Sequence, residues 1–366
     1  MTRVSLLATG LQTALGTGSE FHDAAVRGGA TGVREHPWMV SLQGEPVYCA
    51  MAFAPDPEPT AARWCALIDG AWGDAMSRLG NVDLESSIDV VLCLPRPRPG
   101  LPEALESSLV AHVRRHAGER GASARVHVVR TGAAGAGAVL ARAQTATRHR
   151  LVIIGVDTWI EPTAIETLDR ARQLHRGGHG AVVSWGLVPG EGAAVLVLTT
   201  DEPGPHAAAV PVLHAVGLAS EPTPVGSSRP IVGRALAGAL GAAVGMSADD
   251  ADLVVSDFGA APWRAEEWAL AALASPDTAA LLACEMVAPA DRWGDLGAAT
   301  LPALIALAAG GLAVGRRRAT RALVVTMCAD GDRAVVHLER PAGAPHDEWP
   351  ASGRVQRLAG ATSATG

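Results

Sequence analysis

The sequence predicts a large α/β protein whose inner helices carry small side chains. Its 366 residues are 48% hydrophobic, which suits one large α/β unit or two fused halves. Glycine and alanine are abundant while aromatic residues make up only 4%, which indicates packing by close backbone approach. Apolar segments alternate with segments of helical spacing in the order β-α-β-α-β, which is typical of a doubly wound sheet.

The first half contains five predicted strands with helices between them. Strands are expected at residues 4–10, 88–95, 126–129, 151–157 and 194–198, and helices at residues 19–29, 60–79, 102–118, 135–143 and 161–175. Ser19 is the predicted cap of the first helix and Gly28 its end. The apolar strand at residues 88–95 is expected in the centre of a parallel sheet. Residues 35–59 hold several prolines and show no clear period, so we expect a loop there.

The second half repeats this succession of elements. Strands are expected at residues 210–216, 252–257, 280–284, 322–328 and 334–340, and helices at residues 230–244, 264–274 and 298–314. Because the order recurs without detectable sequence similarity, we interpret residues 1–202 and 203–345 as two structurally related halves. The C-terminal stretch is rich in Pro, Gly, Ala and Ser, and we expect residues 346–366 to form a flexible tail.

Charge and cysteine content exclude several classes of protein. The net charge of −7, with no basic run longer than residues 316–318, argues against nucleic acid as the main partner. Five cysteines without a CxxC pair indicate reduced thiols in a cytoplasmic protein, with no disulfide framework. Residues 296–315 carry no charge but are mostly Ala, Gly and Leu, so we favour a buried core helix over a membrane span. The N-terminal apolar run is too short for a signal peptide.

The turn that opens the helix at residues 135–143 is the centre of the functional argument. It joins a strand to a helix of tiny side chains, an arrangement by which many α/β enzymes present a nucleophile at a helix N-terminus. This turn contains Thr131, Gly132, Ala133 and Ala134, and so offers no nucleophile. The question is whether a catalytic architecture has been kept without its chemistry.

Four segments resemble the β-ketoacyl synthases of the thiolase-like superfamily. VPGEGAAVLVL at residues 188–198 is similar to the family's PGEGA segment. ATGLQTALG, GVDTWIEPTAIETLDRARQL and GDLGAAT, which begin at positions 8, 155 and 294, add support through their order and spacing. The resemblance covers residues 4–338 and implies a thiolase-like, duplicated five-layer αβαβα fold. Two small-residue helices would then lie buried between the sheets, in agreement with the reading of residues 135–143 and 298–314.

The family's active members carry a cysteine nucleophile and two histidines, and the resemblance places other residues at all three positions. Ala133, or in its stead Ala134, stands at the nucleophile position. Phe258 stands at the first histidine position and Asp295 at the second, while Arg292 only approximates a lysine expected shortly before. Condensation needs both the covalent catalysis of a thiolate and the oxyanion stabilisation of the histidines. The resemblance therefore implies an inactive β-ketoacyl synthase homologue.

Other side chains near this turn are candidates for chemistry. Asp257 and Asp295 end two turns that are expected to meet below Ala133, and a carboxylate pair can perform acid/base work. We favour a capping role, because Asp295 suits a helix N-cap. Cys328 lies in the turn of the last strand pair and is a candidate reactive thiol, while Cys93 is expected to be inert. The candidate pocket residues are Thr131, Gly132, Ala134, Asp257, Arg292 and Cys328.

The histidines give only a weak metal signal. His112 with His116, and His175 with His179, have the HxxxH spacing. The first pair has arginines beside it and no obvious third ligand, so we favour a solvated helix face. In the second pair, the glycines at residues 177–178 would break the helix that such a pair needs. We therefore expect no metal and no cofactor.

The leading hypothesis is a non-catalytic ketosynthase-like protein that acts through protein–protein binding. The resemblance implies two settings: an adaptor or chaperone associated with type VI secretion effectors, or a chain-length-factor-like subunit that pairs with an active ketosynthase. Either would form a homodimer or heterodimer through the thiolase-type interface, with an effector or acyl carrier protein as a further partner. A third hypothesis is an unconventional acyl-thioester transferase or hydrolase that uses Asp257, Asp295 or Cys328.

Overall fold

A computed structural model describes most of the chain. The described residues are 3–56, 60–80, 84, 87–146, 150–175, 186–201, 210–223, 225–227, 229–244, 251–259, 261–313 and 319–340. The predicted tail at residues 346–366, the proposed boundary between residues 202 and 203, and His179 lie outside these residues. The boundary between the halves therefore stays a prediction.

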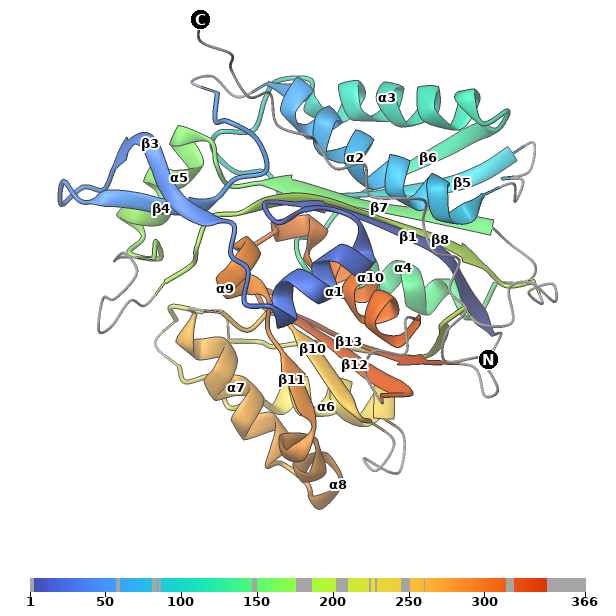
Figure 1. Ribbon diagram of the computed structural model, residues 1–366. Coiled ribbons are helices and arrows are strands. Elements are labelled where there is room, and N and C mark those ends of the chain that lie inside the picture. Colours follow the sequence, from blue (N-terminus) through green and yellow to red (C-terminus); the bar gives the residue numbers. More distant parts are fainter. Residues whose placement is uncertain are drawn as a thin grey trace, which may run out of the picture.

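The first half forms a mixed sheet covered on its outer face by two helices (Figure 1). Its strands lie in the order β6 (Ser123–Arg130), β5 (Ser87–Leu94), β7 (Arg150–Thr158), β8 (Glu191–Thr199) and β1 (Val4–Thr13). β5 runs parallel to both neighbours, as predicted, while β8 is antiparallel to β7 and β1. The covering helices are α2 (Ala61–Leu79) and α3 (Leu105–Glu119), whose apolar faces form one core cluster with the sheet.

The second half repeats the strand order of the first. Its strands lie in the order β11 (Glu285–Val287), β10 (Leu253–Ser256), β12 (Arg321–Met327), β13 (Asp332–Glu339) and β9 (Val212–Ser220). Counted along the chain, both halves thus read third, second, fourth, fifth, first, which is the duplication that the succession of elements predicted. The outer helices here are α6 (Arg234–Val244) and α7 (Pro262–Ala272), followed by α8 (Pro276–Ala279).

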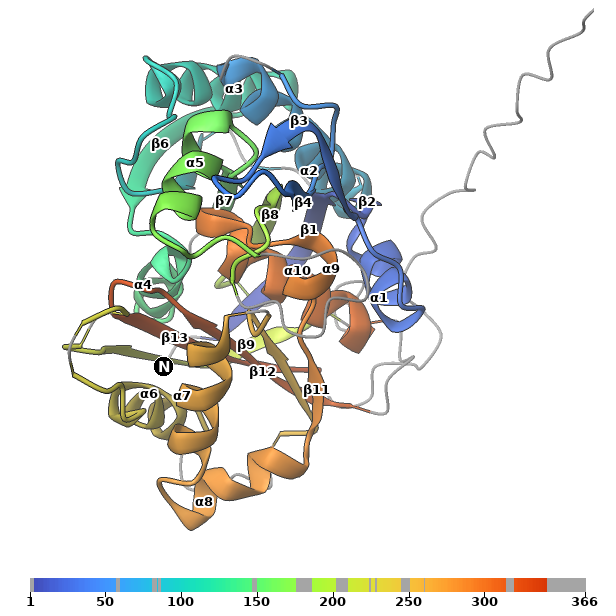
Figure 2. The ribbon, with the colours of Figure 1, turned by 90° about the vertical axis from the view of Figure 1, so that its left-hand side faces the viewer.

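The strands of the two halves lie on either side of a central layer of helices (Figure 2). They are joined by a short antiparallel pairing of β1 with β9, at Val4 with Leu213 and Ser5 with Val212. Between them lie α1 (Ser19–Arg27), α4 (Gly135–Ala143), α9 (Ala290–Trp293), the 3-10 turn η4 (Gly297–Ala299) and α10 (Thr300–Ala313). One apolar cluster lies between the strands of the first half and their outer helices, a second lies around the central helices between the two sets of strands, and a third lies between the strands of the second half and their outer helices. The fold therefore has the five layers αβαβα that were predicted.

Helix α10 explains the long uncharged stretch of the sequence. All of its 14 residues are buried, so no polar face is required, and the choice of a core helix over a membrane span is confirmed. Small side chains let it lie against α4 and both sheets at once. Within the part of the chain that the structure describes, no helix is long and apolar enough to cross a membrane.

Three local predictions are corrected by the structure. Residues 35–59 are not simply a loop, because β3 (Val33–Val40) and β4 (Pro46–Ala50) form a two-stranded hairpin whose Val47 packs against α5 (Pro162–Arg170). The N-cap of α1 is Gly18, while the hydroxyl of Ser19 hydrogen-bonds Thr9 instead. The strand expected at residues 280–284 is the 3-10 turn η3 (Ala280–Ala283), and the strand β11 follows it. The short β2 (Gly16–Thr17) pairs with the end of β1.

Candidate functional site

The turn before α4 lies at the point where the two halves meet. Strand β6 ends at Arg130, and Gly132 then takes a φ of +71°, a left-handed conformation that glycine adopts readily. Ala134 is the N-cap of α4, and both Ala133 and Ala134 are buried. Their methyl groups cannot attack a thioester or donate a proton. The turn thus has the strand-turn-helix form that the sequence predicted, with an inert side chain at its centre.

The thiol of Cys328 closes this turn from the opposite half. Cys328 follows β12, and its Sγ atom accepts a hydrogen bond from the backbone N–H of Ala134 at 3.2 Å. A Cβ on Gly132 would lie 3.7 Å from the same sulfur, so the thiol packs directly on the turn. Burial raises the pKa of Cys328 to about 12, against the smaller opposing effect of the Ala134 amide. The sulfur is held as a neutral thiol at physiological pH.

Two carboxylates and an arginine form a buried cluster beside Cys328. Arg264, near the start of α7, donates from one terminal nitrogen to Asp295 Oδ2 at 2.9 Å and from the other to the carbonyl oxygen of Asp257 at 3.0 Å. Asp257 Oδ2 also accepts from Thr326 Oγ1 at 2.8 Å and from the Met327 amide at 2.9 Å. We call Asp257, Arg264 and Asp295 the buried triplet.

The buried triplet is organised for structure more than for proton transfer. Burial raises the pKa of Asp257, and the positive charge of Arg264 opposes that effect. Asp295 Oδ1 accepts from the amide of Gly297 at 2.8 Å, which gives the backbone bond expected of a capping residue. The N-cap of η4 is Leu296, however, so Asp295 forms a turn within the loop instead of capping the helix itself.

The remaining predicted positions divide between the site and other regions. Thr131 lies in the turn, with its Oγ1 packed against Gly135. Phe258 is buried and its ring packs on Trp268 at 5.4 Å between centroids, in the core cluster below the second sheet. Arg292 instead donates to the carbonyl oxygen of Gly29 at 2.9 Å and pairs with Asp291. The structure therefore brings together the turn, Cys328, Asp257 and Asp295, while the described contacts of Arg292 lie elsewhere.

Sequence reasoning missed Arg264 as a member of the site. The sequence predicts Arg264 only as the first residue of a Trp- and Glu-containing helix at residues 264–274. Only the fold brings its guanidinium between two carboxylates, Asp257 just after β10 and Asp295 just before η4. An arginine within seven residues of Asp257 was a usable signal, since a buried carboxylate pair needs a cation nearby.

The PGEGA segment supports the site from the side of the first half. Gly190 lies so close to the loop before η4 that an added Cβ would stand 2.6 Å from the carbonyl oxygen of Trp293. Gly294 in turn has a φ of +75° and packs back on Gly190. The two segments form a bridge between Pro189 and Asp295. Glycine is required at both positions because the two backbones are in direct contact.

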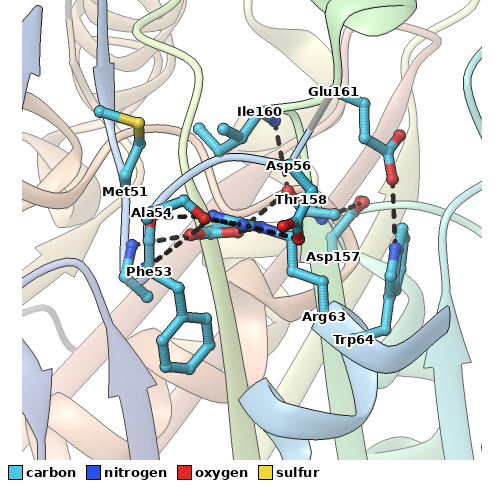
Figure 3. A network of polar contacts seen from close by, with 12 residues as sticks. Met51, Phe53, Ala54, Asp56, Arg63, Trp64, Asp157, Thr158, Ile160 and Glu161 are labelled. Carbon is cyan, nitrogen blue, oxygen red and sulfur yellow. Dashed lines mark hydrogen bonds and ion pairs between the residues drawn. The ribbon is translucent and has the colours of Figure 1, made fainter. Parts of the chain in front are cut away.

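Glu191, which follows Gly190 in the chain, belongs to a buried polar network around Arg63, and Figure 3 shows that network from close by. Its carboxylate is fully buried and pairs with Arg63 of α2 at 2.6 Å through both oxygens. It also accepts from the Ala52 amide at 2.7 Å and from Thr158 Oγ1 at 3.1 Å. Arg63 donates further to the Ala54 carbonyl oxygen at 2.7 Å. The network fixes the start of β8 to α2, which agrees with a structural role for this glutamate.

Several solved structures have a similar fold over nearly the whole length of this chain. A chain of the complex AntDE:AntF, a type II PKS acyl-carrier protein with its ketosynthase bound to the hexaketide, has a TM-score of 0.72 at 13% identity, covering 93% of this chain and 99% of that one. The ishigamide ketosynthase/chain length factor has a TM-score of 0.67 at 17% identity, with coverages of 93% and 99%. The ketosynthase ApeO in complex with its chain length factor ApeC, from Xenorhabdus doucetiae, has a TM-score of 0.66 at 14% identity, with coverages of 93% and 98%.

These likenesses are of structure, since the identities are low. No protein-family model matches the sequence, and no curated protein matches it at a significant level. The match nevertheless extends over nearly the full length of both chains in each comparison. The resemblance to β-ketoacyl synthases is thereby confirmed at the level of fold: this chain has the thiolase-like fold of ketosynthases and chain length factors.

Proposed function

We propose that the chain is a non-catalytic ketosynthase-like protein that acts in the cytoplasm by binding another protein. One observation supports the proposal: the thiol and the two carboxylates nearest the turn before α4 are buried and engaged in contacts within the chain. Cys328 is buried and bonded to the Ala134 amide, and Arg264 ties Asp257 to Asp295. With Ala133 at the predicted nucleophile position, no described side chain there is suited to form a covalent acyl intermediate.

The acyl-thioester enzyme hypothesis has less support. A nucleophilic cysteine needs a lowered pKa and access to substrate, whereas burial raises the pKa of Cys328 to about 12. A carboxylate acting as general base must reach its substrate, whereas Asp257 and Asp295 are buried and turned to Arg264 and backbone amides. The same contacts that stabilise the buried triplet thus oppose its use in catalysis.

The chain-length-factor-like role is the setting that the comparisons favour. Two of the similar structures are a ketosynthase/chain length factor and a ketosynthase in complex with its chain length factor. The type VI adaptor role rests on the sequence resemblance alone. In either setting the partner would use the thiolase-type interface, and an effector or an acyl carrier protein would be the further partner.

Strand β6 offers a physical basis for such an interface. It ends the sheet, and within the described residues no other strand pairs with its outer edge. Its side chains alternate between exposed and half-buried up to Val128, and Val129 and Arg130 are half-buried as well, so its apolar residues are only partly covered. An open edge of eight residues that is neither shortened nor capped with proline is a template for pairing with another chain. We therefore propose that the partner adds to the sheet at β6.

Co-expression with a cysteine-bearing ketosynthase from the same gene neighbourhood tests the proposal. We expect a one-to-one complex by size-exclusion chromatography with light scattering. Hydrogen exchange should slow at β6 amides on assembly, while the opposite edge strand, β11, serves as the internal control. A stable homodimer that ignores the synthase would exclude the chain-length-factor-like role, and turnover of an acyl thioester by the chain alone would overturn the non-catalytic proposal.

A further inference from the structure

The outer helical layer holds a group of potential metal ligands that is unconnected with the buried triplet. His112 and His116 of α3 both point their Nε2 atoms at Oδ1 of Asp69 on α2, at 2.7 and 2.6 Å. The ligand atoms of the three residues all lie within 4.8 Å of one another. The expectation that the His112–His116 pair lacks a third ligand is therefore wrong. The third ligand comes from another helix, 43 residues earlier in the chain than His112.

We propose that Asp69, His112 and His116 bind a divalent transition-metal ion of the zinc type. Two imidazoles and one carboxylate are a common ligand set for such an ion, whereas magnesium and calcium prefer oxygen ligands. The i and i+4 positions of the histidines put both rings on one face of α3. Asp69 is half exposed, so water can complete a tetrahedral coordination from the solvent side.

The ligands are held in place by packing as well as by polar contacts. The ring of His116 is stacked on Trp72 of α2, with 5.4 Å between centroids and an interplanar angle of 22°. The two histidine rings meet edge to face at 4.7 Å. Trp72, Leu109, Val113 and Ala117 belong to the core cluster that joins α2 and α3. The two helices therefore present their ligands from a fixed backbone, which lowers the entropic cost of binding.

A carboxylate also lies behind one of the ligands. The Nδ1 atom of His116 lies 3.3 Å from Glu119 Oε2. Metal-bound histidines commonly donate their second ring N–H to such a carboxylate, which fixes the tautomer that leaves Nε2 free for the metal. Glu119 thus occupies the position of such a supporting carboxylate.

One neighbouring cation works against the site and provides a sharp test. Arg115 donates to His112 Nδ1 at 3.1 Å and approaches Asp69 Oδ1 at 3.9 Å. Its positive charge repels a metal ion, and its hydrogen bond favours the His112 tautomer that carries a proton on Nε2. Arg115 is half exposed and also bonds Glu119, so it can turn away when a metal binds. Replacing Arg115 should therefore raise the affinity for the metal ion. If the three residues formed only a cluster of ion pairs, the same substitution would weaken that cluster.

Titration of tag-free, chelator-stripped protein with zinc chloride tests the proposal by calorimetry and thermal unfolding. We expect one zinc ion per chain and a rise in Tm, because the ion binds only the folded state. Asp69→Asn, His112→Gln and His116→Gln should each lower the affinity by more than about 100-fold, and Glu119→Gln by about 10-fold. Arg115→Ala should raise the affinity. His127→Gln is the matched control, because among the described contacts His127 approaches one carboxylate, Asp89, at 3.7 Å.

The outcomes distinguish a built site from an incidental one. Absence of binding at about 1 mM zinc would overturn the proposal. Binding that survives Asp69→Asn and His112→Gln would also overturn it, because the ion would then lie elsewhere. If His116→Gln fails to fold because its ring no longer packs on Trp72, the near-isosteric Asp69→Asn, at an exposed position, decides the question alone.

Discussion

The backbone amide of Ala134 lies 3.2 Å from the sulfur of Cys328, so a thiol from the second half covers the turn of the first. In a catalytic cysteine, a helix N-terminus lowers the pKa of the thiol and stabilises the thiolate. Here burial outweighs that effect and the pKa of Cys328 rises to about 12. The turn is therefore covered by a neutral thiol that comes from another segment of the chain.

Cys328 should be inert in the native protein. With iodoacetamide at pH 7.5, we expect no labelling of Cys328 over a period in which the half-buried Cys65 is modified, because thiolate and access are both required. Mass spectrometry of peptides gives the extent at each position, and unfolding in guanidinium should make both cysteines equally reactive. Faster labelling of Cys328 than of Cys65 would instead support the hypothesis of an acyl-thioester transferase or hydrolase that uses Cys328.

A cysteine at the predicted nucleophile position should not create a condensing enzyme. In Ala133→Cys the new thiol would have Phe258 and Asp295 at the two positions where the resemblance predicts histidines, so we expect neither oxyanion stabilisation nor decarboxylation to be assisted. We expect no condensation product above background with acyl and malonyl thioesters, measured by mass spectrometry. Circular dichroism checks that the variant is folded. Condensation by this single variant would contradict the assignment of Phe258 and Asp295 to the histidine positions.

The sequence predicts the layers of this fold well because each layer has its own pattern. The uncharged stretch of α10, rich in Ala, Gly and Leu, favoured a core helix over a membrane span, and the recurring order of strands indicated the duplication. The β3–β4 hairpin was missed because Pro37 and Pro46 are usual signs of a loop, whereas an isolated two-stranded hairpin tolerates them. Its stability comes from Val47 packing on α5, which local sequence cannot reveal.

The sequence predicted where in the chain the site lies, but it did not predict all the side chains that contact its residues. The resemblance pointed to the turn before α4, and the structure brings Asp257, Asp295 and Cys328 to its neighbourhood. Arg264 and Asp69 were missed because each acts on residues of another element. Such contacts depend on how helices cross strands and other helices, and a single sequence does not contain that information in any local period.

Arg264 should be essential for stability although it is not a catalytic residue. In Arg264→Met, Asp257 and Asp295 lose their shared cation while remaining buried, so we expect the free energy of unfolding at pH 7 to fall by about 3–5 kcal/mol. Guanidinium denaturation measures the change. The deficit should shrink as pH falls, because protonation removes the unpaired charges.

Arg96 provides the matched control for that experiment. It pairs with Asp330 at 3.0 Å and Asp332 at 2.7 Å, which resembles the two-carboxylate setting of Arg264, but its side chain is 46% exposed. Arg96→Met should therefore change the free energy of unfolding by less than about 1 kcal/mol. Equal effects of the two substitutions would show that the buried triplet does not hold the site together.

Glu161 should make stability depend on pH in the neutral range. Burial raises its pKa from 4.5 to about 7, with the hydrogen bond from Trp64 Nε1 at 3.2 Å opposing the shift. Its second oxygen is buried and has no hydrogen-bond partner among the described residues. Because the folded-state pKa is the higher one, the folded protein binds this proton more tightly. The resulting stability is present below about pH 4.5 and is lost as pH rises to about 7.

The variant Glu161→Gln isolates this effect because glutamine mimics the protonated carboxyl and can still accept from Trp64. Above pH 7, we expect the variant to exceed the wild type in free energy of unfolding by on the order of 3 kcal/mol, and the difference should vanish near pH 4.5. Glu166→Gln, within the helix α5 for which Glu161 is the N-cap, is the control, since Glu166 is half exposed and pairs only with Arg170 in the described contacts. A difference that stays constant between pH 4.5 and pH 8 would mean that Glu161 is ionised throughout, and that Trp64 and Arg63 outweigh its burial.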